Sequence, residues 1–96
     1  MRRSEIFKRY IMYLHVGNNK NIRESRIIGI FDMDNATVSS VTRKFLSGAQ
    51  KKGLVESAGY EIPKSFILYS DGDNAKVCFS QLASSSLIGR QSTKRN

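Results

Sequence analysis

The feature that most constrains the fold is a change in apolar spacing near the middle of the chain. Between Tyr13 and Phe31, apolar residues gather in short runs typical of strands, whereas from Thr37 they follow the spacing of one side of a helix. These helical positions are Val38, Val41, Phe45, Leu46 and Ala49. We therefore expect one principal helix in a chain otherwise built from strands.

The ends of this helix are marked by residues that suit them. Asn35 or Thr37 is expected to cap the start by accepting a hydrogen bond from a free backbone N–H. Positive charge and backbone freedom at the end come from Lys51, Lys52 and Gly53. On a helical wheel, one face opposite the apolar stripe holds Arg43, Lys44, Gln50 and Lys51. The helix should therefore expose a basic face.

A β-hairpin is expected before the helix. Residues 13–16 form a strand pattern that ends at Gly17-Asn18-Asn19-Lys20-Asn21, whose glycine and asparagines tolerate tight turns. Ile22 and then residues 26–31, rich in isoleucine and ending in Phe31, indicate the second strand. Asp32-Met33-Asp34-Asn35 should end it.

Three further strands are expected after the helix. They are a short one at 54–57, a longer one at 65–69 and a third at 75–82, the last two joined by an Asp71-Gly72-Asp73-Asn74 turn. Residues 83–88 suit a helical turn. The prediction is an α+β fold: a small antiparallel-rich sheet of about five strands with one principal helix.

The charge of the chain lies mostly at its ends. The net charge is +8 and the isoelectric point is about 10.0, but residues 1–11 carry +3 and residues 90–96 another +3. We expect a basic N-terminal extension at 1–11, one folded domain at 12–88 and a disordered basic tail at 89–96. The total charge alone is thus weak support for a nucleic-acid partner of the folded domain.

Several function classes lack support in the sequence. One cysteine, Cys78, allows no intrachain disulfide, which fits a cytoplasmic location, and no apolar run reaches the roughly 18 residues of a membrane span. Neither GxxxxGK[ST] nor GxGxxG occurs, so no nucleotide-binding loop is recognised. We expect no enzyme, no cofactor, no metal site, no membrane contact and no small-molecule substrate.

The residues whose types suggest chemistry have simpler interpretations. His15 is expected to pack on its strand, and residues 32–35 to form a turn and helix cap rather than half of a calcium loop. Asp71 and Asp73 belong to a hairpin tip, where solvent keeps carboxylates ionised.

Two groups of cations remain as candidates for binding. One lies near the first hairpin, at Lys20, Arg23 and Arg26; the other, on the helix, comprises Arg43, Lys44, Lys51 and Lys52. A helical face with both arginine and lysine can hold a nucleic-acid backbone without reading bases. A solvated helix face explains the second group equally well.

The order of motifs resembles the RemA/RemB family of extracellular-matrix regulatory proteins. The series runs MYLHVGNNKNIRESRIIGIFD, a capped basic helix, KKGLV, PKSFIL before a hairpin, and LASSSLIGR, and it covers Met12 to about Arg90. The resemblance implies a fold related to the LytTR DNA-binding domain and assembly into homo-oligomeric rings around which double-stranded DNA wraps. It also implies transcriptional regulation of biofilm-matrix genes.

The resemblance also suggests which residues contact DNA. In the family an arginine precedes the hydrophobic second strand, and Arg26 in ESRIIGIFD has that place. The family has adjacent arginines after a Tyr-Gly turn, whereas Tyr60 here precedes Glu61-Ile62-Pro63 and Lys64 is the nearby cation. The predicted DNA-binding residues are Arg26, Lys64, Arg43, Lys44 and Arg23.

Two functions therefore stay open. The first is a ring-forming DNA-binding regulator. The second is an oligomeric protein-interaction module of the same family with little direct DNA binding, which would use its sheet edges or Ile62-Pro63. The missing arginine pair is the feature that separates them.

Overall fold

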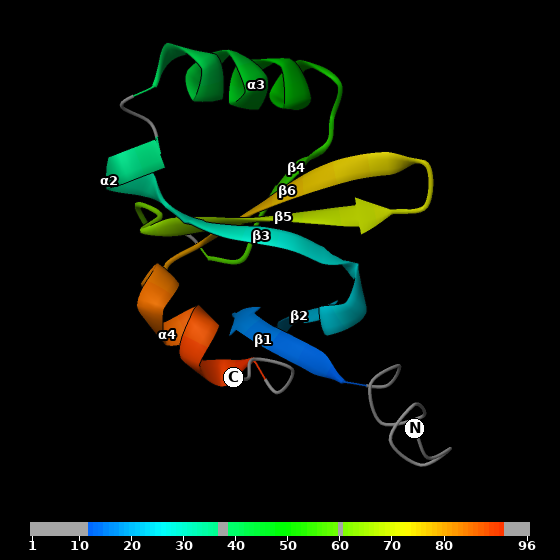
Figure 1. Ribbon diagram of the computed structural model, residues 1–96, viewed down its shortest axis with the longest axis vertical. Helices are drawn as coiled ribbons and strands as arrows, with labels where there is room; N and C mark the ends of the chain where they lie inside the picture. Colours follow the sequence, from blue (N-terminus) through cyan, green and yellow to red (C-terminus); the bar gives the residue numbers. More distant parts are fainter. Residues whose placement is uncertain (1–11, 37–38, 60, 92–96) are drawn as a thin grey trace.

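The computed structural model describes residues 12–36, 39–59 and 61–91, and it has the predicted α+β class. The described strands form a two-stranded and a four-stranded sheet, not one sheet of about five strands. Figure 1 shows the principal helix α3 on one side of the larger sheet and β1, β2 and α4 on the other. The elements are β1 Tyr13–Gly17, β2 Lys20–Arg23, η1 Glu24–Arg26, β3 Ile27–Asp32, α2 Met33–Ala36, α3 Ser40–Lys51, β4 Val55–Ser57, β5 Ser65–Asp71, β6 Asn74–Ser80 and α4 Ser84–Arg90.

The four-stranded sheet has the order β3-β5-β6-β4. β5 pairs antiparallel with β3 and β6, while β4 runs parallel to β6. The predicted turn at 71–74 is confirmed: Asp71 pairs with Asn74, and Gly72 has the positive φ of 69° that such a turn favours. β3 lies at one edge of the sheet. Its N-terminal and C-terminal ends mark the two opposite ends of the sheet.

The first hairpin was predicted with the wrong second strand. β1 pairs antiparallel with the short strand β2, through a turn in which Asn18 and Asn19 both have positive φ. The 3-10 turn η1 then breaks the chain, and β3 leaves to join the other sheet. The isoleucine-rich run was recognised as a strand, but local pattern does not reveal which sheet a strand joins.

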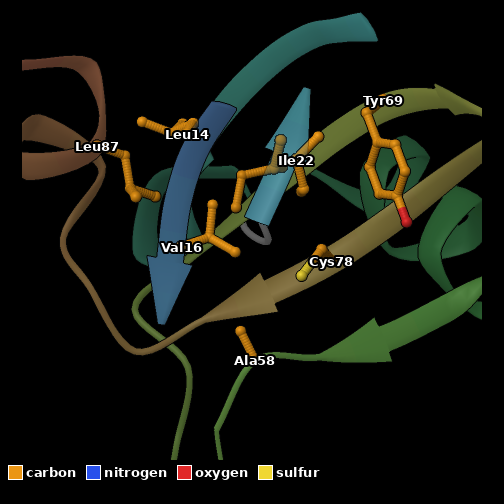
Figure 2. Packing of buried hydrophobic residues seen from close by; sticks show 8 residues of the cluster. Leu14, Val16, Ile22, Ala58, Tyr69, Cys78 and Leu87 are labelled. Atoms are coloured by element: carbon orange, nitrogen blue, oxygen red, sulfur yellow. The ribbon is translucent and has the colours of Figure 1, made fainter. Parts of the chain in front are cut away.

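The face of the sheet toward β1 and α4 carries the larger core. Figure 2 shows its buried side chains, which come from both sheets and from α4. They are Leu14, Val16, Ile22, Ala58, Ile67, Tyr69, Cys78 and Leu87. Two buried serines satisfy their hydroxyls here, since Ser80 donates to the Val16 carbonyl (2.7 Å) and Ser65 to the Leu82 carbonyl (2.7 Å). These bonds fix the hairpin and the segment before α4 to the sheet.

The opposite face is covered mainly by α3. Its core contains Phe66, Val77 and Ala49, with Leu46 and Leu54 partly buried beside them. The apolar stripe of the helix is not buried along its whole length. Val41 is 74% exposed and Phe45 44% exposed, because α3 contacts the sheet mainly through its C-terminal half.

The predicted ends of the helices also need correction. α3 begins at Ser40, and its cap is Ser39, whose hydroxyl accepts from the N–H groups of Val41 and Thr42, rather than Asn35 or Thr37. Thr37 and Val38 lie outside the described residues, as do residues 1–11, Tyr60 and residues 92–96. α4 includes Gly89 and Arg90, so the folded part extends past the predicted boundary at 88.

Candidate nucleic-acid interface

A groove of about 380 Å³ lies where the first hairpin meets one end of the larger sheet. We call it the basic groove. Tyr69, Lys76 and Glu56 reach it from three neighbouring strands, because Tyr69 pairs with Lys76 and Glu56 pairs with Cys78, two residues from Lys76 on the same face. β2 and η1 supply the opposite wall. Its lining is Tyr13, Lys20, Asn21, Ile22, Arg23, Arg26, Glu56, Tyr69, Asp71 and Lys76.

Glu56 joins the hairpin to the sheet at the base of this groove. Its carboxylate pairs with the Lys20 ammonium at 2.5 Å and accepts a hydrogen bond from the Tyr69 hydroxyl. Burial opposes the charged form of Glu56, but the Lys20 and Tyr69 hydrogen bonds and nearby positive charge outweigh it and lower its pKa. Burial, and then the bond to Glu56, raises the pKa of Tyr69. Lys20 is thus used largely in holding the fold.

Asp71 is shared by two cations at the rim of the groove. Its carboxylate lies 3.1 Å from the Lys76 ammonium and 3.7 Å from an Arg26 guanidinium nitrogen. The side chains of Arg26 and Asp71 are each 48% exposed. Exposed ion pairs of this kind contribute at most about 1 kcal/mol. An external anion can therefore replace Asp71 at little cost.

Arg23 occupies the neighbouring position on the rim. Its guanidinium carbon lies 5.8 Å from the centre of the Tyr13 ring, within cation–π range. This contact holds the arginine over a ring that is itself exposed, without neutralising its charge. Four cations and two carboxylates line the basic groove, which leaves a formal charge of +2.

Only some of the predicted DNA-binding residues come together. Arg23 and Arg26 share the basic groove, but Lys64 lies at the other end of the sheet, where its carbonyl accepts from the Met33 N–H. The length of β3, about 20 Å at 3.3 Å per residue, separates the two ends. Arg43 and Lys44 are exposed on α3, across the sheet. The five predicted residues therefore form no single patch in one chain.

Sequence reasoning missed the part of the groove that the sheet supplies. Lys76, Glu56 and Tyr69 fall within strand patterns that alone indicate no site, although Lys76 shares its alternating face with Cys78 and Ser80. That alternation was a usable signal. Knowing which face the hairpin would cover required the tertiary structure.

Other residues considered for chemistry have structural roles. Asp32 accepts a hydrogen bond from the Asn35 N–H at 3.1 Å, so the predicted turn is present, but it lies at the start of the short helix α2 and not of α3. Burial, with a smaller effect of the Glu56 charge, raises the pKa of Cys78 to about 11, so its thiol stays protonated at neutral pH. Across the described parts of the chain, no three histidine, cysteine or carboxylate side chains gather as a metal site, and no helix has the length and apolar character to cross a membrane.

Comparison with known proteins adds no assignment. No protein-family model matches the chain, and no curated protein matches it. The resemblance to the RemA/RemB family thus rests on the sequence motifs alone.

Proposed function

We propose that this protein is a non-enzymatic, homo-oligomeric regulator that binds double-stranded DNA through the basic groove. The observation that carries the proposal is the convergence of Arg23, Arg26 and Lys76, from three elements, on one exposed hollow beside the Lys20–Glu56 pair. Lys20 and Arg23 come from β2, Arg26 from η1 and Lys76 from β6. The family resemblance supports the more specific parts of the proposal, which are regulation of matrix genes, a cytoplasmic location and ring assembly.

The charge of the groove suits backbone contact better than base reading. Arginine presents a planar fork to phosphate oxygens, and a phosphate can take the place that Asp71 has between Arg26 and Lys76. A formal charge of +2 is small for one subunit. Repetition around an oligomer would multiply the phosphate contacts, and the DNA sequence would be recognised through its deformability.

Duplex binding tests the groove directly. Affinity of the full chain for a short duplex should fall steeply as salt rises, because phosphate contacts release counterions. Arg26→Gln should weaken binding and reduce the slope of log affinity against log salt by about one. The matched control Lys51→Gln removes the same charge from α3. If both variants weaken binding equally, the groove is not the interface; if the wild type does not bind, the DNA function is wrong.

Asp71 allows a test in the opposite direction. Asp71→Asn releases Arg26 and Lys76 and should tighten DNA binding about tenfold, since a charge that competes with phosphate is removed. Asp73→Asn changes the net charge equally, on the same hairpin but outside the groove lining. An equal gain from both would mean that only long-range charge matters.

Assembly is tested separately by native mass spectrometry. The proposal expects one large homo-oligomer at micromolar concentration, with the same mass in Arg26→Gln. A monomer in this range would overturn the ring.

A second function is favoured by exposed apolar residues. Ile28 on the edge strand β3 is 60% exposed, and Ile62 is 88% exposed. An edge strand with apolar side chains is suited to pairing with another chain. If the protein assembles or binds another protein but no duplex, the interaction-module function replaces the regulator.

A further inference from the structure

A second hollow, of about 410 Å³, lies between α3 and the tip of the β5–β6 hairpin. We call it the helix groove. It lies on the side of the sheet opposite the core of Figure 2, away from the basic groove. Its lining is Lys44, Phe45, Gly48, Ala49, Lys52, Leu54, Asp73, Asn74 and Ala75.

The wall that α3 gives to this groove exposes apolar surface between two lysines. Phe45 and Gly48 lie on one flank of the helix, and Val41, one turn before Phe45, continues that flank. Phe45 and Val41 are both outside the core under α3, and Leu54 borders that core. An exposed aromatic side chain beside a hollow is a typical anchor point for a protein partner.

Gly48 is not explained by the fold of the described residues. It lies in the interior of α3, where glycine costs about 0.5–1 kcal/mol relative to alanine. Its φ is not positive, and a Cβ added there would meet no atom within 4 Å. Neither backbone conformation nor packing therefore requires glycine. Its position in the groove lining suggests instead that it leaves room for something that approaches closely.

The charge around the helix groove indicates which kind of partner surface complements it. α3 contains no acidic residue, and Lys44 and Lys52 line the hollow, opposed only by the exposed Asp73 within this lining. Residues 1–11 and 90–96 of the chain are each +3 and are electrostatically unsuited to it. Apolar side chains with carboxylates beside them would complement this surface.

We propose that the helix groove binds the apolar face of an acidic amphipathic helix from a partner protein. Apolar side chains of that helix would fill the space above Gly48 and contact Phe45 and Leu54, while its acidic borders would meet Lys44 and Lys52. This inference is independent of the DNA function, because it uses another face of the molecule.

The test uses the full chain and a labelled synthetic helix of about 18 residues, with leucines on one face and glutamates along both borders. Fluorescence anisotropy should show micromolar binding. A second peptide with lysine for every glutamate should bind at least about tenfold more weakly, because it meets Lys44 and Lys52 with like charge.

Gly48→Leu is the decisive variant. It should fill the groove and weaken peptide binding at least about tenfold, yet keep or raise the thermal midpoint, since leucine is the better helix former and meets open space. Ser47→Leu, one residue earlier and outside the groove, is the matched control and should leave binding unchanged. Loss of binding in a variant as stable as the wild type cannot be attributed to unfolding.

Charge is tested on the same helix. Lys44→Gln with Lys52→Gln should weaken binding of the acidic peptide about tenfold, whereas Arg43→Gln with Lys51→Gln, which remove equal charge outside the groove, should not. Equal losses, absence of binding, or equal binding of both peptides would overturn the proposal. Two further results for Gly48→Leu would also overturn it. A changed oligomeric mass would indicate that a second copy of the chain occupies the helix groove, and loss of duplex binding would indicate that DNA occupies it.

Discussion

The two faces of the four-stranded sheet are covered in different ways. Toward β1 and α4, side chains from two sheets and a helix meet, and Leu14, Val16 and Leu87 are almost fully buried. Toward α3, one helix covers the sheet with its C-terminal half and leaves Val41 and Phe45 exposed. The first face has most of the apolar burial that stabilises the fold.

Polar contacts follow the same division. The hairpin and α4 are held by the Ser80 bond to Val16, by the Lys20–Glu56 pair, and by an Arg90 guanidinium that donates to the His15 carbonyl at 3.3 Å. The exit of α3 is held by backbone bonds such as Leu54 N–H to the Ala49 carbonyl at 2.9 Å. We infer that the hairpin face sets stability, and that the helix face tolerates change and is free for contact.

The largest expected effect concerns α4. Leu87→Ala removes a fully buried side chain and should lower the free energy of unfolding by about 3 kcal/mol, because a cavity remains. The next residue, Ile88, is 42% exposed, and Ile88→Ala should cost less than half as much. Urea denaturation of both variants measures this. Equal losses would show that α4 is not part of the core.

Ser80→Ala should have the next largest effect. The hydroxyl donates to the Val16 carbonyl and accepts from the Leu82 N–H at 3.0 Å, so its loss leaves buried polar groups without partners. We expect about 2 kcal/mol of destabilisation. Ser86→Ala, at an exposed position of α4, is the control and should change stability by less than about 0.5 kcal/mol. If Ser80→Ala leaves the free energy of unfolding nearly unchanged, the hairpin does not unfold together with the core.

The pH dependence of stability tests the Glu56 contact. The folded-state pKa of Glu56 lies below the ordinary glutamate value of 4.5, so the stabilising effect of its charge is complete above that value and is lost as pH falls through the lower, folded pKa. Glu56→Gln should therefore lower stability at pH 7 and make it less sensitive to pH in the acid range. A wild-type slope in Glu56→Gln would contradict the contact.

Much of the fold follows from local sequence signals. Helical spacing identified α3, and Asn18-Asn19 and Asp71-Gly72 identified both hairpin turns. The separation of β2 from β3 does not follow from local signals, because a three-residue 3-10 turn changes the direction of the chain without interrupting its strand-like composition. Long-range pairing decides which sheet each strand joins.

The candidate sites were predictable to a smaller extent. Lys20, Arg23 and Arg26 are close in sequence and were grouped correctly. Lys76 and Asp71 join them only through strand register, which a single sequence does not give. Exposure of Phe45 was missed for a related reason: an apolar stripe predicts a buried face only when another element is wide enough to cover it.

The smallest expected effect is that of Val41→Ala on the helix face, with Val16→Ala on the hairpin face as its reference. Val16→Ala, at a fully buried position of β1, should cost about 2 kcal/mol through lost burial and a residual cavity. Val41→Ala removes a side chain that is already 74% exposed, and alanine is the better helix former, so the two contributions oppose each other. We expect a change within about 0.5 kcal/mol of zero in urea denaturation. A loss at Val41 comparable to that at Val16 would mean that this face is covered in solution, although the described residues leave Val41 exposed.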